Sequence, residues 1–111
     1  MRAGDVVEVD FGIPVGSEPG FRHPAVVVTA DLVLEARPRT VHVVFVTSNT
    51  KRALPTEVPI DGARLTKDSV VQCHLCTVVS PLRIVDDRSG NVGPASLASI
   101  RAVLADLLDI G

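Results

Sequence analysis

The sequence predicts an α+β domain in which a bent antiparallel sheet, or a partly closed barrel, is followed by one helix. Three observations lead to this fold class. Short segments rich in valine, a residue type typical of strands, recur through most of the chain between turn residues. The last apolar segment instead repeats at helical spacing. The length of 111 residues suits a single hydrophobic core, so we expect one domain over residues 1–111.

Two expected strands flank a polar loop near the start of the chain. Residues 6–11 alternate apolar and acidic side chains, which is the two-residue period of a half-buried strand. Residues 12–23 form the loop. Pro24 then opens a second strand over residues 25–29, at a position where a missing backbone N–H is tolerated.

The middle of the chain supplies the strands expected at the centre of the sheet. Asp31 is placed to cap a short helical turn over residues 32–36. Residues 41–46 are apolar on both faces apart from one histidine, which predicts a central strand covered on both sides. A short strand is expected at residues 56–60. Residues 70–79 form either one long strand or two strands separated by a bulge.

The C-terminal segment is predicted as an amphipathic helix that packs on the strands. Pro94 suits the first position of a helix, where its missing N–H is not needed. Aliphatic residues recur at helical spacing, with charged residues between them. They are Leu97, Ile100, Val103, Leu104, Leu107 and Leu108.

Charge and aromatic content limit how the chain could bind nucleic acid. The net charge is -2, but residues 20–67 carry seven Lys or Arg against four Asp or Glu, whereas the rest carries four against nine. The middle of the chain is therefore basic and its ends are acidic. With three Phe and no Trp or Tyr, a nucleic acid would be held mainly by phosphate contacts rather than by stacked bases.

Neither an apolar run of the roughly 20 residues that cross a bilayer nor the apolar stretch of a signal peptide is found in the sequence. We therefore expect a cytoplasmic protein without a membrane partner. The two cysteines, Cys73 and Cys76, are too few for a disulfide framework. Side chains three residues apart on a strand face opposite sides, so both thiols could bind one ion only through a bulge, and we expect no metal.

The loop that leads into the second strand carries the residues best suited to chemistry. Arg22 and His23 place a permanent cation and a titratable imidazole directly before Pro24. Thr47 ends the central strand, and we expect these two strands to lie side by side. The three side chains can then converge. Composition alone favours a plain solvated loop instead.

A hydroxyl, an imidazole and a guanidinium around one point suit phosphodiester cleavage. A base takes the proton from an attacking hydroxyl while fixed cations hold the developing charge. In RNA the attacking group can be the substrate's own 2′-OH. Neither a protein nucleophile nor a metal or other cofactor is then required.

Five segments precede the amphipathic end of the chain and are best considered together. They are Gly4-Asp5-Val6-Val7, Gly16-Ser17-Glu18 with Pro24-Ala25-Val26-Val27-Val28, Val46-Thr47-Ser48-Asn49, Leu54-Pro55-Thr56-Glu57-Val58 and Asp68-Ser69-Val70-Val71. In this order, and over nearly the whole chain, the segments and the amphipathic end resemble the MazF/PemK family of toxin endoribonucleases. The resemblance implies the SH3-like small antiparallel barrel of CcdB-like and PemK-like toxins, with a C-terminal helix.

The resemblance also implies partners and an activity. It implies a homodimer that cleaves single-stranded RNA sequence-selectively without a metal, and that a co-expressed antitoxin inhibits. Messenger RNA is the expected substrate, with ribosomal and transfer RNA left open. Two alternatives remain: a toxin of the same fold that poisons DNA gyrase by binding it, and a catalytically weakened homologue. Gyrase poisons use residues of the terminal helix, whereas the distinctive residues here lie in basic middle loops.

This sequence departs from the family pattern at one position. The family usually has a catalytic arginine directly before the proline, whereas here that position is His23 and the arginine is Arg22. Neighbouring side chains of a strand point to opposite faces, so the exchange changes which group reaches the site. His23 takes the role itself, or a bulge lets Arg22 reach the site, or the enzyme is weakened.

Further roles follow from the resemblance. Thr47 matches the catalytic Ser/Thr position, although a strand-end threonine can also simply bond to the backbone. Glu18 matches an acid implicated in some members. Contacts with RNA are expected from the two loops and from the strand that follows Asp68, at Ser17, Ser48, Asn49, Lys51, Arg52 and His74.

Overall fold

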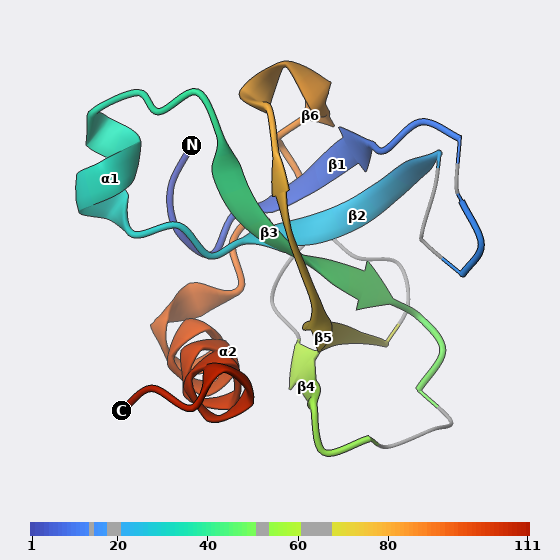
Figure 1. Cartoon of the computed structure of the whole chain (residues 1–111), viewed down its shortest axis with the longest axis vertical. Helices are drawn as coiled ribbons and strands as arrows, with labels where there is room; N and C mark the ends of the chain where they lie inside the picture. The colour runs from blue at the N-terminus through green and yellow to red at the C-terminus, as the bar shows by residue number, and fades with distance from the viewer. Residues whose placement is uncertain (14, 18–20, 51–53, 61–67) are drawn as a thin grey trace.

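The computed structural model describes residues 1–13, 15–17, 21–50, 54–60 and 68–111 (Figure 1). One six-stranded sheet has the order β4-β5-β3-β2-β1-β6, and all neighbouring strands are antiparallel. The strands are β1 (Val6–Asp10), β2 (Arg22–Val27), β3 (Val41–Thr47), β4 (Glu57–Ile60), β5 (Ser69–Val79) and β6 (Ile84–Asp86). The helical elements are α1 (Asp31–Glu35), the single 3-10 turn η1 (Pro81–Arg83) and α2 (Gly93–Leu108).

The predicted fold class is confirmed: an antiparallel sheet is followed by one C-terminal helix. In Figure 1 the strands cross at steep angles, as in a strongly bent, barrel-like sheet. α2 lies beside β4 and β5 at one side of this sheet. Among the described residues, no helix is long and apolar enough to cross a membrane.

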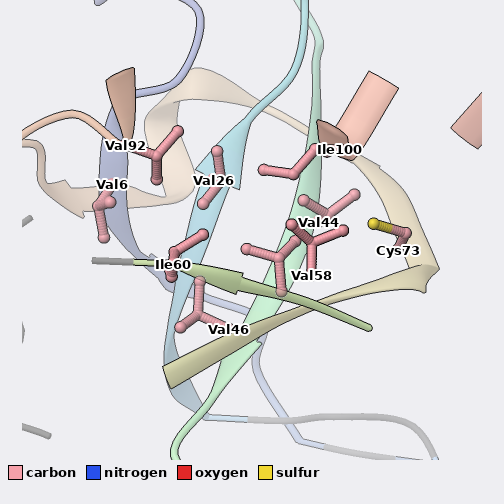
Figure 2. Close-up of a cluster of buried hydrophobic side chains, with 10 residues drawn as sticks. Val6, Val26, Val44, Val46, Val58, Ile60, Cys73, Val92 and Ile100 are labelled. Carbon is pink, nitrogen blue, oxygen red and sulfur yellow. The ribbon is translucent and has the colours of Figure 1, made fainter. Parts of the chain in front are cut away.

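Alternation along the strands sorts the buried side chains onto two faces of the sheet. The face toward α2, which we call the helix face, carries the cluster drawn in Figure 2: Val6, Val26, Val44, Val46, Val58, Ile60, Val71, Cys73, Val92 and Ile100. The opposite face, which we call the far face, carries Val7, Val9, Ala25, Val27, Val41, Val43 and Val79. Both faces of the central strands are therefore apolar, as predicted for β3.

β3 lies beside β2, as expected, with Ala25 opposite Phe45. Its other neighbour, β5, shifts register: Val44 lies opposite Cys76, whereas Phe45 lies opposite Gln72. Residues 73–75 therefore form a bulge in β5. Of the two possibilities left open by the sequence, the structure has one long strand that carries a bulge.

The boundaries of β2 differ from the sequence prediction. The strand begins at Arg22 and ends at Val27, because its pairing with β1 extends as far as Asp10 opposite Arg22. Pro24 consequently lies inside the strand, opposite Glu8, rather than at its start.

Other elements also differ in detail. α1 starts at Asp31, so the prediction that Asp31 caps this helix was wrong; its Oδ1 accepts the backbone N–H of Ala3 at 2.7 Å. α2 starts at Gly93, one residue before Pro94. The edge strand β6 was not predicted, and it pairs with β1 through Val9 and Ile84.

Asn91 ties the start of the chain to the start of α2. Its Nδ2 donates to the carbonyl of Ala3 and to the carboxylate of Asp5, at 3.0 Å each. Its Oδ1 accepts the backbone N–H of Gly93 at 2.8 Å. Gly4 passes close to this amide with a φ of 88°, a left-handed conformation that favours glycine. The first residues of the chain therefore help to hold the N-terminal end of α2 in position.

Candidate functional site

An aromatic group marks the end of the far face where β2 begins. The rings of Phe11 and Phe45 lie 4.5 Å apart between centroids. The imidazole of His23 meets Phe45 edge-on, with centroids 5.4 Å apart and planes at 88°. His23 also lies opposite Val9, a member of the far-face cluster. The half-buried His23 side chain therefore continues the far face.

A hydrogen bond sets the proton position on the neutral His23 ring. Nδ1 lies 3.0 Å from the backbone carbonyl oxygen of Pro24. Because a carbonyl oxygen can only accept, Nδ1 must donate this bond. The neutral ring then keeps its lone pair on Nε2, which is the atom that can accept a proton.

Thr47 projects from the same face of the sheet. Phe45 and Thr47 are two residues apart on β3, so their side chains share a face, and the Phe45 ring is the one that His23 contacts. The pairing of β2 with β3 runs from Val27 opposite Val43 to Ala25 opposite Phe45 and stops before His23 and Thr47. The Thr47 Oγ1 accepts the backbone N–H of Asn49 at 3.2 Å, which holds the hydroxyl at the strand end.

Arg22 lies on the other side of β2. It pairs with Asp10, whose neighbours at the same alternation are on the helix face, and its side chain is exposed. The structure has regular β1 to β2 pairing from Arg22 to Val26, so no bulge turns Arg22 toward the far face. Arg22 can reach a substrate only from the rim of the strand.

The remaining predicted contacts lie in several places. Ser17 and Ser48 are exposed in the two loops. Asn49 bonds to Thr47 through its backbone. His74 lies in the bulge of β5, where its Nδ1 and the Thr56 hydroxyl are 2.8 Å apart, so it belongs to the β4 side of the sheet. Three further predicted residues lie outside the described residues, namely Glu18, Lys51 and Arg52.

A recess of about 630 Å³ lies along β4 and the start of β5. Its wall is formed by Thr50, Leu54, Glu57, Pro59, Ile60, Asp68, Ser69 and Val70. Thr47 is not part of this wall, although Val70 is its partner on β5.

Arg83 is a cation near the site that the sequence did not indicate. Its Nη1 donates to the backbone carbonyl of Asp10 at 3.3 Å, at the base of the loop between β1 and β2. It comes there because the unpredicted β6 pairs with β1. No local pattern could have identified it, since the contact joins distant parts of the chain.

The two thiols are poorly suited to metal binding or nucleophilic chemistry. Burial, with a smaller contribution from the neighbouring Cys76, raises the pKa of Cys73 to about 11. Burial also raises the pKa of Cys76. Cys73 lies in the bulge of β5 and Cys76 directly follows it, so regular strand alternation does not apply to this pair. Even so, Cys73 points into the helix-face cluster (Figure 2), whereas Cys76 is exposed. Within the described ranges, no three His, Cys, Asp or Glu side chains are grouped to hold a metal.

Comparison with known proteins identifies the family. Residues 2–108 match the model of the PemK-like, MazF-like toxin of type II toxin-antitoxin system. The chain belongs to the PemK/MazF toxin family. Endoribonuclease MazF6 of Mycobacterium tuberculosis is 39% identical over 100 residues, which cover 87% of this chain and 86% of that protein. Endoribonuclease EndoA of Bacillus subtilis is 30% identical over 88 residues, which cover 78% and 76%.

Solved structures of other proteins share the fold. MazF from Deinococcus radiodurans superimposes with a TM-score of 0.82 at 25% identity, covering 99% of this chain and 97% of that one. An endoribonuclease from a Mycobacterial species, solved in complex with its cognate antitoxin, gives a TM-score of 0.79 at 22% identity and covers 100% and 97%. The small barrel-like sheet with a terminal helix is therefore the fold of this toxin.

Proposed function

We propose that this toxin is an endoribonuclease that cuts single-stranded RNA through attack of a 2′-OH on the adjacent phosphate. The observation that carries the proposal is the placement of the His23 imidazole on the face of Thr47, with its Nδ1 proton bonded to Pro24. The curated relatives, which are named endoribonucleases, support the same activity.

The chemistry assigns one role to each group. Nε2 of His23 takes the proton of the 2′-OH, and the freed oxygen forms a bond to phosphorus. The Thr47 hydroxyl donates to a non-bridging phosphate oxygen as negative charge develops there. The bond from phosphorus to the 5′-oxygen breaks, that oxygen takes a proton from a water molecule, and the His23 imidazolium returns its proton to solvent. The products are a 2′,3′-cyclic phosphate and a 5′-hydroxyl, and no metal or cofactor enters the reaction.

The remaining predicted residues keep the roles that the sequence suggested. Arg22 holds a phosphate from the rim, and Ser17, Ser48, Asn49 and His74 contact the RNA strand. Glu18 as a catalytic acid, and Lys51 and Arg52 as RNA contacts, remain predictions, since these three residues lie outside the described residues. The exposed hydroxyls and the Arg22 guanidinium of this set support phosphate contacts.

We also propose the biological setting of the enzyme. It acts in the cytoplasm as a homodimer, on messenger RNA or on ribosomal or transfer RNA, and a cognate antitoxin inhibits it. The family's description as a toxin of type II toxin-antitoxin system supports the antitoxin partner.

The test is to incubate purified protein with a long single-stranded RNA in EDTA and to map the ends of the products. Discrete fragments with 5′-hydroxyl ends are expected. His23→Ala should lower the cleavage rate about 10²- to 10⁴-fold, the usual contribution of a general base. Arg22→Ala should lower it less and mainly raise KM. Intact RNA together with trapped DNA gyrase would instead support a gyrase poison, and intact RNA alone would indicate an inactive homologue.

Substitution separates His23 from an arginine in the same role. An arginine stays charged and cannot accept the proton of the 2′-OH. A fully active His23→Ala enzyme would exclude His23 as the base.

A further inference from the structure

Phe21 is held in a conformation that phenylalanine rarely adopts. Its φ is 57°, in the left-handed region, where a bulky side chain costs about 1–2 kcal/mol. Two backbone hydrogen bonds hold it there: the Phe21 N–H donates to the carbonyl of Gly12, and the Phe21 carbonyl accepts the N–H of Phe11 at 2.8 Å. A strained residue that the surrounding backbone fixes so firmly points to a use for its side chain.

The Phe21 side chain has no place in the core. It is 66% exposed, whereas the other two phenylalanines, Phe11 and Phe45, contact each other and lie inside the aromatic group beside His23. Exposing a phenylalanine gives up the free energy of its burial. The backbone of Phe21 therefore reduces stability at this position, and its side chain contributes little to offset that cost.

The surroundings of Phe21 are cationic and lie next to the candidate catalytic groups. Arg22 follows it directly and His23 comes next on β2. Arg83 reaches the carbonyl of Asp10 at the base of the same hairpin. The facing acid, Asp10, uses its Oδ1 to accept the backbone N–H of Gly12. An exposed ring next to Arg22 in sequence, on a hairpin whose base Arg83 contacts, matches a nucleotide, which presents a flat base and a phosphate.

We infer that Phe21 is a stacking platform for one base of the RNA strand, with Arg22 and Arg83 holding the adjacent phosphates. This inference rests on the proposed endoribonuclease function and adds a contact to it. Phe21 alone among the three phenylalanines is exposed, so stacking involves one base. Phosphate contacts therefore still dominate the affinity. Phe21 positions the strand so that a scissile phosphate reaches His23 and Thr47.

The experiment measures binding of a 2′-O-methyl oligonucleotide that copies a segment cut by the wild-type protein, since this probe lacks the attacking hydroxyl. Phe21→Asn removes the ring while keeping a residue that tolerates a left-handed φ. We expect its binding to weaken roughly tenfold or more, the usual effect of losing one stacked base. Phe21→Tyr keeps the ring and should bind like wild type. The denaturation midpoint of Phe21→Asn should stay equal or rise, because strain is relieved.

An abasic substitution identifies the stacked base. Probes with one base removed at a time are compared between wild type and Phe21→Asn, and the difference between the proteins should vanish at one position only. Ile13→Ala is the matched control, because Ile13 is 86% exposed in the same loop but has no ring. It should bind the probe like wild type.

The outcomes separate the two claims. A Phe21→Asn protein that binds the probe as tightly as wild type overturns the stacking role while leaving the nuclease intact. Equal losses for Phe21→Asn and Ile13→Ala, together with a changed oligomeric state, would show a protein contact and also overturn it. A wild-type protein that neither cuts RNA nor binds the probe would instead refute the endoribonuclease proposal itself.

Discussion

The two faces of the sheet differ in what lies at the ends of their strands. On the helix face, α2 covers the strands and Ile100 is fully buried among valines. On the far face the valines are equally buried, but the row ends in His23 and Thr47, which are only half-buried. The proposed catalytic groups thus lie on the far face, away from α2, and substitutions on the two faces should have different effects.

The largest expected effect is on the helix face. Ile100→Ala removes a fully buried side chain from the helix-face cluster and should lower the free energy of unfolding by about 2–5 kcal/mol. Urea denaturation measures this. Leu108→Ala is the control on the same helix, because Leu108 is 65% exposed and should cost under about 1 kcal/mol.

The same variant sharpens the comparison between the faces. At a temperature where Ile100→Ala is folded, its RNA cleavage per folded molecule should match wild type, since Ile100 is on the helix face rather than on the face of His23. A cleavage rate that falls far more than the folded fraction would show that the two faces are coupled.

The second effect is on the far face. Thr47→Ala removes the hydroxyl that faces the candidate site and should slow RNA cleavage about 10²-fold, as for the loss of one donor to a developing oxyanion. Its unfolding free energy should fall by only about 1 kcal/mol, for the lost bond from Asn49. Thr47→Ser keeps the hydroxyl and should restore most of the rate. Full activity of Thr47→Ala would assign the threonine a purely structural role.

The elements that could be predicted from the sequence are those whose residue pattern is local. Alternation at residues 6–11 and the helical repeat of α2 are local, so the fold class and most elements could be predicted. The bulge at residues 73–75 could not be placed, because the valines of β5 suit either face and the shift is set by pairing with β3. β6 is short and exists through its pairing with β1.

The site shows the same limit. The sequence predicted Arg22, His23 and Thr47 as catalytic candidates, but alternation alone cannot say which of two neighbouring side chains faces a third strand. That depends on the register of β2 against β1 and β3, which is set by contacts distant in sequence. The contact of His23 with Phe45 follows from that register, whereas the approach of Arg83 to Asp10 follows from the pairing of β6 with β1.

A third prediction concerns the residues that seat α2 over the helix face. Gly4→Ala would place a Cβ 2.8 Å from Asn91 Oδ1, at a φ of 88° that disfavours alanine. We expect a loss of about 1–2 kcal/mol or more in unfolding free energy. Gly16→Ala is the control, because its φ is also positive, at 60°, while nothing lies within 4 Å of its Cβ. The difference between the two variants isolates the contact with Asn91, and equal losses would show that this contact is unimportant.

The smallest expected effect distinguishes the two cysteines, because Cys73 is buried in the helix-face cluster whereas Cys76 is exposed. Because burial raises the pKa of Cys73 to about 11, the folded chain holds this proton more tightly than the unfolded chain does. The contribution of the protonated thiol to stability is complete below the ordinary value of 9.0 and is lost as pH rises toward about 11. Denaturation midpoints should therefore decline over that interval.

The sequence has no tyrosine, so no phenol titrates over the same pH range and adds to this decline. Cys73→Ala should flatten the decline, whereas Cys76→Ala, at an exposed thiol, should leave most of it. Alkylation at pH 8 should likewise modify Cys76 first and Cys73 only on unfolding, because its sulfur lies inside the helix-face cluster. Equal labelling of both thiols in the folded protein would mean that the bulge of β5 opens and exposes the core beneath α2.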